Sequence, residues 1–312
     1  MIVKKIPILQ GFPALETVKY LSNTKNELSE YNPIFYDIET TGLSRYTAFV
    51  YLIGAVRFEE NQWMLYQWMG EDENEEALVL QEFASFLTNA DCTIQYNGNR
   101  FDQPFLEERY RKHKMKQPDL ENFVGIHNRK YCDGGQCIRL YKTFMKKKDP
   151  EAANIVMGHN EEDLLGLGTI FSLLAYKKLY DGEYHPKQCV ILEQELKIVI
   201  ELSAAAPVNV SCGNSDFYLS VNGYEARMLV HLKEGKLRQY YRNYKDYEFI
   251  PGEDTAMPKS ITRYMDKSLK IATTPQTCYT WFNCDEDFLN NEKKQMQYLT
   301  HTLPFFLDNL NK

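Results

Sequence analysis

The chain has 312 residues, which is long for a single domain and sufficient for two domains with a substantial core. Hydrophobic residues make up 44% of it and charged residues 25%, which is the composition of an ordinary soluble globular protein. The formal net charge of −7 lacks the basic balance that nucleic-acid-binding proteins usually show, and no apolar run reaches the roughly 20 residues that a membrane span needs.

The N-terminal residues lack the apolar region and the cleavage site of a secretory signal, so the expected location is the cytoplasm. The 7 cysteines are odd in number and scattered, and we expect reduced thiols that are mostly buried. Cys132 and Cys137 lie close in sequence, but no second cysteine pair or histidine pair completes a zinc site.

The chain begins with an expected leader segment, residues 1–30, that contains one possible helix. Residues 33–70 then show three strand-like runs with short links, which predicts an antiparallel meander. Side chains of the first run, "PIFYDIE", alternate between two faces of the strand. One face carries Ile34, Tyr36 and Ile38, and the other carries Phe35, Asp37 and Glu39.

Helical and strand-like patterns alternate over the next part of the chain. The spacing of apolar residues predicts a helix over 72–90, and "CTIQYNG" reads as a strand that ends in the Asn97–Gly98 turn. A second helix is expected to begin at or just before Asp102. The remaining predicted elements are a short helix over 118–126, a helical stretch over 134–145 and a long helix from 159 that ends at Asp181–Gly182.

The pattern becomes β-rich after about residue 184. Residues 216–241 read as two tight hairpins that turn at Asn222–Gly223 and Glu234–Gly235. A helix near 289–311 is expected to end the chain. We therefore predict an α/β domain over residues 31–183 and a smaller β-rich accessory domain over residues 184–312.

Three segments carry acids that suggest chemistry. Asp37 and Glu39 share one face of a strand, roughly 6.6 Å apart along the chain, and carboxylates at that spacing can converge on one magnesium or manganese ion. Asp102 opens a helix, where an acid also simply complements the helix dipole. His159 and Asp163 lie one helical turn apart on one face, which also fits a plain ion pair. Each feature has an ordinary structural explanation when it is taken alone.

Together, three motifs resemble those of the DEDD 3′–5′ exonuclease superfamily: "FYDIETTGL" (35–43), "YNGNRFDQPFL" (96–106) and "HNEEDLLGL" (159–167). Within that superfamily, the chain resembles the YprB-like ribonuclease-H-like family over roughly residues 30–180. The resemblance implies an α/β fold with a ribonuclease-H-like mixed sheet that is flanked by helices and whose first three strands are antiparallel.

The resemblance also implies a metal-dependent 3′–5′ exonuclease that hydrolyses phosphodiester bonds of single-stranded DNA or RNA. Four acids would hold two divalent ions, Mg²⁺ or Mn²⁺, of which one activates a water and the other stabilises the leaving 3′ oxygen. These acids are Asp37, Glu39, Asp102 and Asp163. His159 would take the proton of that water, a task that suits an unperturbed pKa of about 6.5.

Further residues are candidates for contact with the nucleic acid. Thr40, Asn97 and Phe101 lie within the motifs and would help to place the terminal nucleotide. The basic stretch after the second motif could track phosphates, although a solvated helix face explains such a cluster as well. It includes Arg109, Arg111 and Lys112. The tyrosine-rich "RQYYRNYKDY" is either a set of stacking faces for bases or the exposed side of a hairpin.

Two departures from the family's pattern leave an alternative open. His159 lies four residues before the last aspartate, whereas the family's histidine branch places the base five residues before it. The interval between Asp102 and Asp163 is also short, as if a piece near residues 115–116 had been lost. The alternative is a nucleic-acid-binding or scaffold protein of unknown oligomeric state that uses the same fold with little turnover.

Overall fold

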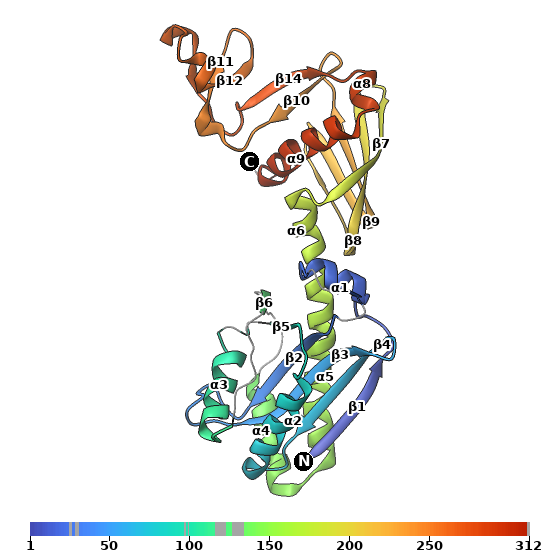
Figure 1. The fold of residues 1–312 in the computed structure, drawn as a ribbon, viewed down its shortest axis with the longest axis vertical. Coiled ribbons are helices and arrows are strands. Elements are labelled where there is room, and N and C mark those ends of the chain that lie inside the picture. The colour runs from blue at the N-terminus through green and yellow to red at the C-terminus, as the bar shows by residue number, and fades with distance from the viewer. Residues whose placement is uncertain are drawn as a thin grey trace. The chain divides into compact units, whose positions relative to one another are not determined.

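The computed structural model describes residues 1–24, 27–28, 31–96, 98, 100–115, 123–126 and 134–310. The chain divides into two compact units, Met1–Ser172 and Leu173–Lys312, and each has a hydrophobic core of its own (Figure 1). The first unit is an α/β domain and the second is β-rich, which confirms the predicted fold class. Across these described ranges, no helix combines the length and the apolar character that membrane spanning requires.

One mixed sheet forms the centre of the first unit. The described strands of this sheet are β1 (Ile2–Ile8), β2 (Pro33–Thr40), β3 (Val50–Glu59), β4 (Gln62–Met69), β5 (Cys92–Tyr96) and β6 (Phe123–Ile126). They lie in the order β1-β4-β3-β2-β5-β6 (Figure 1). Neighbours among β1 to β4 are antiparallel, whereas β5 runs parallel to β2 and β6 runs parallel to β5.

Helices cover both faces of this sheet. They are α1 (Leu15–Leu21), α2 (Glu76–Phe86, after a 3₁₀ turn over Glu73–Glu75), α3 (Asp102–Lys112), α4 (Gly134–Lys147) and α5 (Pro150–Ser172). Helices α2 and α3 pack apolar side chains such as Phe83 and Leu106 against one face. Helices α4 and α5 pack Tyr141 and Val156 against the other face, so the unit has three layers.

The predicted antiparallel meander is confirmed, since β2 pairs with β3 and β3 pairs with β4. The predicted alternation along β2 is also found. Ile34, Tyr36 and Ile38 belong to the core beneath α2 and α3. Phe35 points the other way and meets Phe171 of α5, with ring centroids 5.5 Å apart.

Two expectations for the first unit are corrected. Residues of the expected leader form β1, which pairs with β4 from Ile2↔Met69 to Ile8↔Trp63 and so belongs to the sheet. The short helix predicted over 118–126 is wrong over Phe123–Ile126, which forms β6. A run of four residues is too short to show its period, and parallel strands are often this short and apolar. The sheet thus has a strand beyond β5 despite the short interval before Asp163.

The long helix predicted from residue 159 begins earlier, at Pro150, where proline suits a first helical position. The helical pattern then continues as α6 (Leu174–Asp181), which ends at Gly182 as predicted. Gly182 has a φ of 87°, a left-handed conformation that favours glycine. Because α5 begins at Pro150, His159 and Asp163 lie in its interior. The division between the two units falls before α6, so it precedes the expected boundary at 183/184.

Three small antiparallel sheets build the second unit. One contains β7 (Tyr184–Leu192), β8 (Glu195–Gly213) and β9 (Phe217–His231), and another pairs β10 (Lys236–Tyr240) with β14 (Tyr279–Asn283). The third places β11 (Tyr247–Ile250) between β12 (Thr255–Pro258) and β13 (Ile271–Ala272). Besides α6, the described helices of this unit are α7 (Lys259–Thr262), α8 (Glu286–Leu289) and α9 (Glu292–Asp308), with 3₁₀ turns over Tyr244–Asp246 and Lys267–Leu269.

The hairpin predicted at Asn222–Gly223 is wrong, because β9 continues through these residues. The register between β8 and β9 shifts around the Ala206↔Gly223 pair, so the glycine marks an irregularity within a strand. The turn predicted at Glu234–Gly235 is present between β9 and β10, and both residues have positive φ, 53° and 73°. The last predicted helix is also present, as α9.

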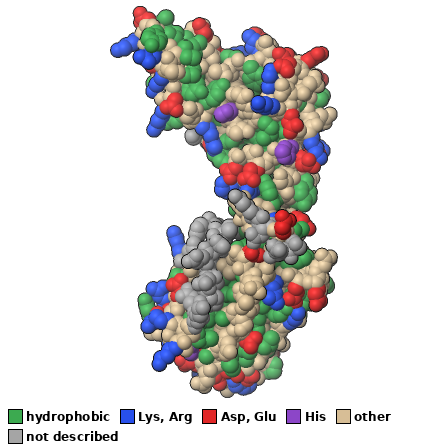
Figure 2. Space-filling view, in the orientation of Figure 1, with side chains coloured by type: hydrophobic (Ala, Val, Ile, Leu, Met, Phe, Trp, Pro, Cys, Tyr) green, Lys and Arg blue, Asp and Glu red, His purple; other side chains and the backbone are tan. Residues whose placement is uncertain are grey.

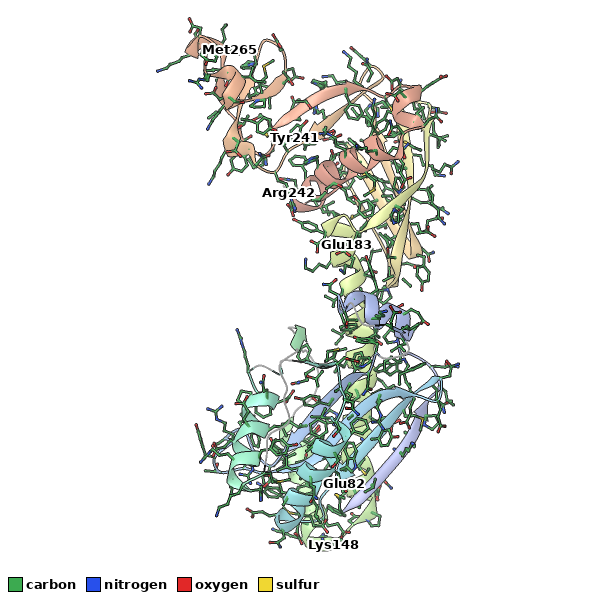
Figure 3. The ribbon with its side chains drawn as sticks, viewed as in Figure 1. Glu82, Lys148, Glu183, Tyr241, Arg242 and Met265 are labelled. Atoms are coloured by element: carbon green, nitrogen blue, oxygen red, sulfur yellow. The ribbon has the colours of Figure 1, made fainter. Side chains whose placement is uncertain are left out.

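The tyrosine-rich stretch contributes to the packing of the second unit. Tyr240 is buried and stacks on Phe305 with ring centroids 3.7 Å apart. Tyr241, which Figure 3 labels beside Arg242, stacks on Tyr247 at 5.2 Å. These rings therefore face their own unit. The described cysteines form no disulfide with one another, and most of them are buried, as expected.

Candidate metal centre

The face of β2 that carries two acids lies against helix α5. The Asp37 carboxylate accepts a hydrogen bond from the side-chain amide of Asn160, with Oδ2 and Nδ2 3.3 Å apart. Farther along the strand, Oε1 of Glu39 lies 3.9 Å from Nε2 of His159. Acids of β2 and side chains of α5, which are far apart in the sequence, therefore lie close together.

Gly54 of β3 allows α5 to approach the sheet this closely. It pairs with Asp37 across the β2–β3 ladder. A Cβ atom at position 54 would lie 1.9 Å from Oδ1 of Asn160 and 2.7 Å from Cδ1 of Leu164. No side chain fits at this position, so glycine is what brings the interior of α5 within reach of the acids of β2.

Three of the four predicted metal ligands converge. One carboxylate oxygen each of Asp37, Glu39 and Asp163 lie within 4.8 Å of one another. Asp37 is buried, whereas the side chains of Glu39 and Asp163 retain 12% and 15% exposure, so solvent reaches the group. Carboxylate oxygens are the ligands that Mg²⁺ and Mn²⁺ prefer, and a divalent cation offsets the repulsion among three like charges. The group therefore fits a hard divalent ion.

A buried amide network holds the Asp37 end of this group. Asn160 is fully buried and donates to Asp37, and its Oδ1 accepts a hydrogen bond from Nε2 of Gln67 at 2.9 Å. Gln67, on β4, also donates to the backbone carbonyl of Met157 at 2.7 Å. Because a buried amide is costly unless it is paired, the chain Gln67–Asn160–Asp37 fixes the orientation of the carboxylate.

His159 lies at the open side of the carboxylate group. Its Nε2 is 3.4 Å from Oδ2 of Asp163 and 3.9 Å from Oε1 of Glu39, and its side chain is 13% exposed. The predicted pairing with Asp163, one helical turn away, is therefore present. The same ring nitrogen also faces Glu39 of β2, so an imidazole adjoins the carboxylate group.

Tyr51 of β3 orients the Glu39 carboxylate. Its hydroxyl donates to Oε2 of Glu39 at 3.4 Å, and its ring stacks on Tyr141 of α4 with centroids 3.8 Å apart. Burial raises the pKa of Tyr51 well above its usual range, and the negative charge of Glu39 raises the pKa further. Tyr51 therefore stays protonated and remains a donor to Glu39.

Asp102, the fourth predicted ligand, begins α3 and is buried. Among the described residues, it is not a member of the group that meets within 4.8 Å. Its carboxylate still affects Tyr36 of β2. Burial raises the pKa of Tyr36, and the negative charge of Asp102 raises this pKa further, more than the charge of Asp37 does. Asp102 is thus near the strand but outside the carboxylate group.

The motif residues expected to contact substrate lie at the ends of β2 and α3. Thr40 is buried, and its hydroxyl donates to the backbone carbonyl of Gly42 at 2.9 Å, just after a register shift between Glu39 and Thr40. Phe101 precedes α3 and packs on Phe105 with centroids 5.5 Å apart. Asn97 lies outside the described residues.

Arg109 does not contact substrate in the manner predicted, because its side chain is only 1% exposed. Its guanidinium donates through two nitrogens to the carboxylate of Glu76, which is fully buried. The same carboxylate accepts from the backbone amide of Val50 at 2.8 Å and lies 2.6 Å from Nε2 of His113. The arginine joins α3 to α2, so its role is structural.

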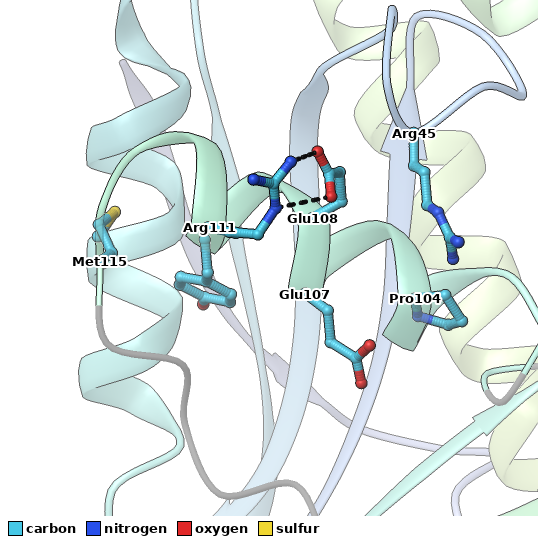
Figure 4. A pocket seen from close by; sticks show the side chains of 7 residues that line it. Arg45, Pro104, Glu107, Glu108, Arg111 and Met115 are labelled. Carbon is cyan, nitrogen blue, oxygen red and sulfur yellow. Dashed lines mark hydrogen bonds and ion pairs between the residues drawn. The ribbon is translucent and has the colours of Figure 1, made fainter.

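Arg111 and Lys112 do lie at the surface of α3. Arg111 is 74% exposed and donates through two nitrogens to the carboxylate of Glu108 (Figure 4). These hydrogen bonds lower the pKa of Glu108. A neighbouring pocket of about 470 Å³ is lined by two acids, Glu107 and Glu108, and by two arginines, Arg45 and Arg111 (Figure 4). On the face of the first unit seen in Figure 2, acidic and basic side chains are similarly interspersed.

The sequence did not indicate the residues that support the acids. Asn160 lies inside the third motif with no role that the pattern indicates, although an asparagine inside a helix is unfavourable and so suggests a specific partner. Gln67, in the otherwise mostly apolar β4, carries a similar signal. Gly54 and Tyr51 lie in a nearly continuous apolar run, and nothing in that run indicates that either residue supports the acids. Cys137 was read as an ordinary buried thiol.

Comparison with known proteins matches the part of the chain that carries the three motifs. The family model of the RNase H superfamily matches residues 34–120 and 115–175. The uncharacterized protein YprB of Bacillus subtilis (strain 168) is 27% identical over 189 residues, which cover 50% of this chain and 45% of that protein. The chain thus matches less than half the length of this curated relative.

Solved structures show similarity at lower levels. A family B DNA polymerase from Pyrobaculum calidifontis has a TM-score of 0.38 and 13% identity, over 48% of this chain and 25% of the polymerase. A product-bound exonuclease I has a TM-score of 0.30 and 12% identity, over 90% of this chain and 70% of that protein. The matched residues, 34–175, contain the three motifs, and the family match and the curated relative support a YprB-like, ribonuclease-H-like character for this region, as the motifs predicted.

Proposed function

We propose that this chain is a metal-dependent nuclease, a 3′–5′ exonuclease that hydrolyses phosphodiester bonds of single-stranded DNA or RNA. The observation that carries the proposal is the convergence of three carboxylates, Asp37, Glu39 and Asp163, from β2 and α5. Membership of a ribonuclease-H-like class supports it, because these acids lie in the motifs that define the resemblance.

The donor set suits Mg²⁺ or Mn²⁺, which would activate a water and stabilise the leaving oxygen when bound. Asp37, Glu39 and Asp163 would hold the first ion. Asp102, which lies near β2 but outside the group, would supply a ligand to a second ion. The Gln67–Asn160 network keeps Asp37 in one orientation, so little rearrangement is needed when the ion binds.

His159 would accept the proton of the attacking water at Nε2. This nitrogen already faces Glu39 and Asp163, and its partial exposure gives the proton a route to solvent. Thr40, Phe101, Asn97, Arg111 and Lys112 would contact the nucleic acid. Arg109 is not among them, because it is buried against Glu76.

The test uses oligonucleotides of DNA and of RNA with a 5′ label, incubated with Mn²⁺. We expect a ladder that shortens from the 3′ end and that a chelator abolishes. Asp163→Asn should slow cleavage by on the order of 100-fold or more, the usual cost of removing a charge-stabilising group from a catalytic site. Glu162→Gln, an exposed neighbour on the same helix, should cleave at the wild-type rate. Equal rates for Asp163→Asn and Glu162→Gln would contradict the proposal.

A second candidate function is a nucleic-acid-binding protein with little turnover. The observation that favours it is the position of Asp102 outside the carboxylate group, because a two-ion mechanism needs that ligand. Binding of the same oligonucleotides without shortening, unchanged in Asp37→Ala, would support this second function. Internal cuts without end shortening would instead indicate an endonuclease.

A further inference from the structure

A second group of ligand atoms adjoins the carboxylates and has a different chemistry. One atom each of Glu39, Cys137 and His159 lie within 4.8 Å of one another. These residues come from three elements, β2, α4 and α5. A set of oxygen, sulfur and nitrogen donors suits Zn²⁺ and similar ions, whereas Mg²⁺ prefers oxygen alone. We propose that Glu39, Cys137 and His159 form a binding site for a thiophilic divalent ion.

The spacing of the donors is close to that of a metal site. Zinc bond lengths to nitrogen, oxygen and sulfur imply ligand atoms about 3.3–3.6 Å apart around a tetrahedral ion. Oε1 of Glu39 and Nε2 of His159 are already 3.9 Å apart. This pair needs to approach by a few tenths of an ångström, and the thiol, which lies within 4.8 Å of both atoms, by no more than about 1.3 Å. A water would occupy the fourth position as in other open zinc sites.

Neighbouring side chains orient these donors. The Tyr51 hydroxyl holds Oε2 of Glu39, so the other oxygen is the one that faces His159. The Tyr51 ring stacks on Tyr141, which lies one helical turn after Cys137 on the same face of α4. One tyrosine of β3 thereby positions both the carboxylate and the helix that carries the thiol.

The burial of the three groups suits entry of an ion from solvent. The Glu39 and His159 side chains are 12% and 13% exposed, while Cys137 is 6% exposed. An arriving ion would meet the carboxylate and the imidazole first and the thiol last. Binding would release the thiol proton to solvent, because the thiolate is the ligand.

The two groups share Glu39, and His159 lies 3.4 Å from Asp163, so ions at the two sites would compete for the same side chains. This consequence rests on the proposed function: a thiophilic ion would engage both a metal ligand and the proposed base. Zn²⁺ should therefore inhibit the cleavage that Mn²⁺ supports.

Cobalt titration of the full chain tests the site directly. Co²⁺ bound to a thiolate gives a charge-transfer absorption, and we expect the wild type to show it and excess Zn²⁺ to abolish it. Cys137→Ser should lose the band and weaken Co²⁺ binding by at least about tenfold, the lower end of the cost of losing even an outer partner of a metal site. Cys92→Ser, a second free cysteine of the same unit, should keep the band.

His159→Ala provides a second variant in case Cys137→Ser does not fold. It should keep the thiolate band but weaken Co²⁺ binding by at least about tenfold, because the imidazole ligand is lost. Three results would overturn the inference: no band in the wild type, a band that survives Cys137→Ser, or unchanged affinity in His159→Ala. None of these readouts involves nucleic acid, so a chain that binds Co²⁺ through Cys137 yet cleaves nothing would contradict only the proposed nuclease activity.

Discussion

Asn160 connects the sheet to the candidate metal centre through a single side chain. It is buried in the interior of α5 and is paired on both sides, as acceptor from Gln67 and as donor to Asp37. Asparagine is a poor helix former, so its presence there is explained by these two bonds and not by helix propensity.

Replacing Asn160 by alanine should destabilise the fold by about 1–3 kcal/mol, because its buried partners lose a hydrogen bond without regaining water. Urea unfolding measures the change. Asn154→Ala, on the exposed side of α5, is the matched control and should change stability by less than about 0.5 kcal/mol. Similar midpoints for the two variants would show that the amide network does not contribute.

Arg109→Met should destabilise the first unit by about 3–5 kcal/mol, because the carboxyl group of Glu76 would stay buried without its principal partner. The exposed Arg111→Met should stay within about 0.5 kcal/mol of the wild type. Both free energies come from urea unfolding. If Arg109→Met were as stable as the wild type and only bound nucleic acid more weakly, Arg109 would contact phosphates, which would contradict its structural role.

Residues that carry charge at motif positions were predictable, whereas their partners were not. The resemblance of the three motifs to a known superfamily implied Asp37, Glu39 and Asp163 as ligands, and the structure brings them together. The sequence did not indicate the burial of Arg109, because its basic neighbours Arg111 and Lys112 suggested that the whole segment is an exposed basic surface. A partner such as Glu76 lies far away in the sequence, and local patterns carry no information about such pairs.

At the scale of elements, the centre depends on how closely α5 packs on β3. The interior of the helix meets the sheet at Gly54, where no Cβ fits. The period-two pattern of β2 and the short links to β3 and β4 predicted these strands, because local alternation determines them. Strand β6 was missed, since its four residues are too few to establish a period.

Gly54→Ala should push α5 away from β2, costing about 1–3 kcal/mol, since the added methyl meets Asn160 and Leu164. Gly158→Ala makes the same chemical change on α5 where a Cβ meets nothing within 4 Å. That control should be stabilised by roughly 0.5–1 kcal/mol, as expected for glycine to alanine in a helix. Urea unfolding compares the pair. A Gly54→Ala variant as stable as Gly158→Ala would mean that the close approach is unnecessary.

At the scale of the molecule, two units have separate cores. The change to a β-rich sequence pattern predicted a second domain. The helical pattern, however, runs from α5 into α6, and the sequence shows no boundary between these two helices. The division therefore falls earlier in the structure than expected. Lys148, labelled in Figure 3, contributes a contact inside the first unit, since its Nζ donates to the backbone carbonyl of Glu71 at 2.8 Å.

Leu303→Ala in the second core should lower local stability by about 2–5 kcal/mol, since the leucine is fully buried. Hydrogen exchange should then accelerate over β7 to α9 while β2 and α5 keep their protection. Leu164→Ala, fully buried in the first unit, should give the reverse pattern. Equal loss of protection in both units from either substitution would contradict separate cores.

The most direct test of the candidate metal centre is anomalous diffraction from crystals soaked with Mn²⁺. We predict a peak coordinated by Asp37, Glu39 and Asp163, with a second peak toward Asp102 when a mononucleotide is present. The account would be contradicted if Mn²⁺ saturated other sites in the crystal while no peak appeared at the three carboxylates.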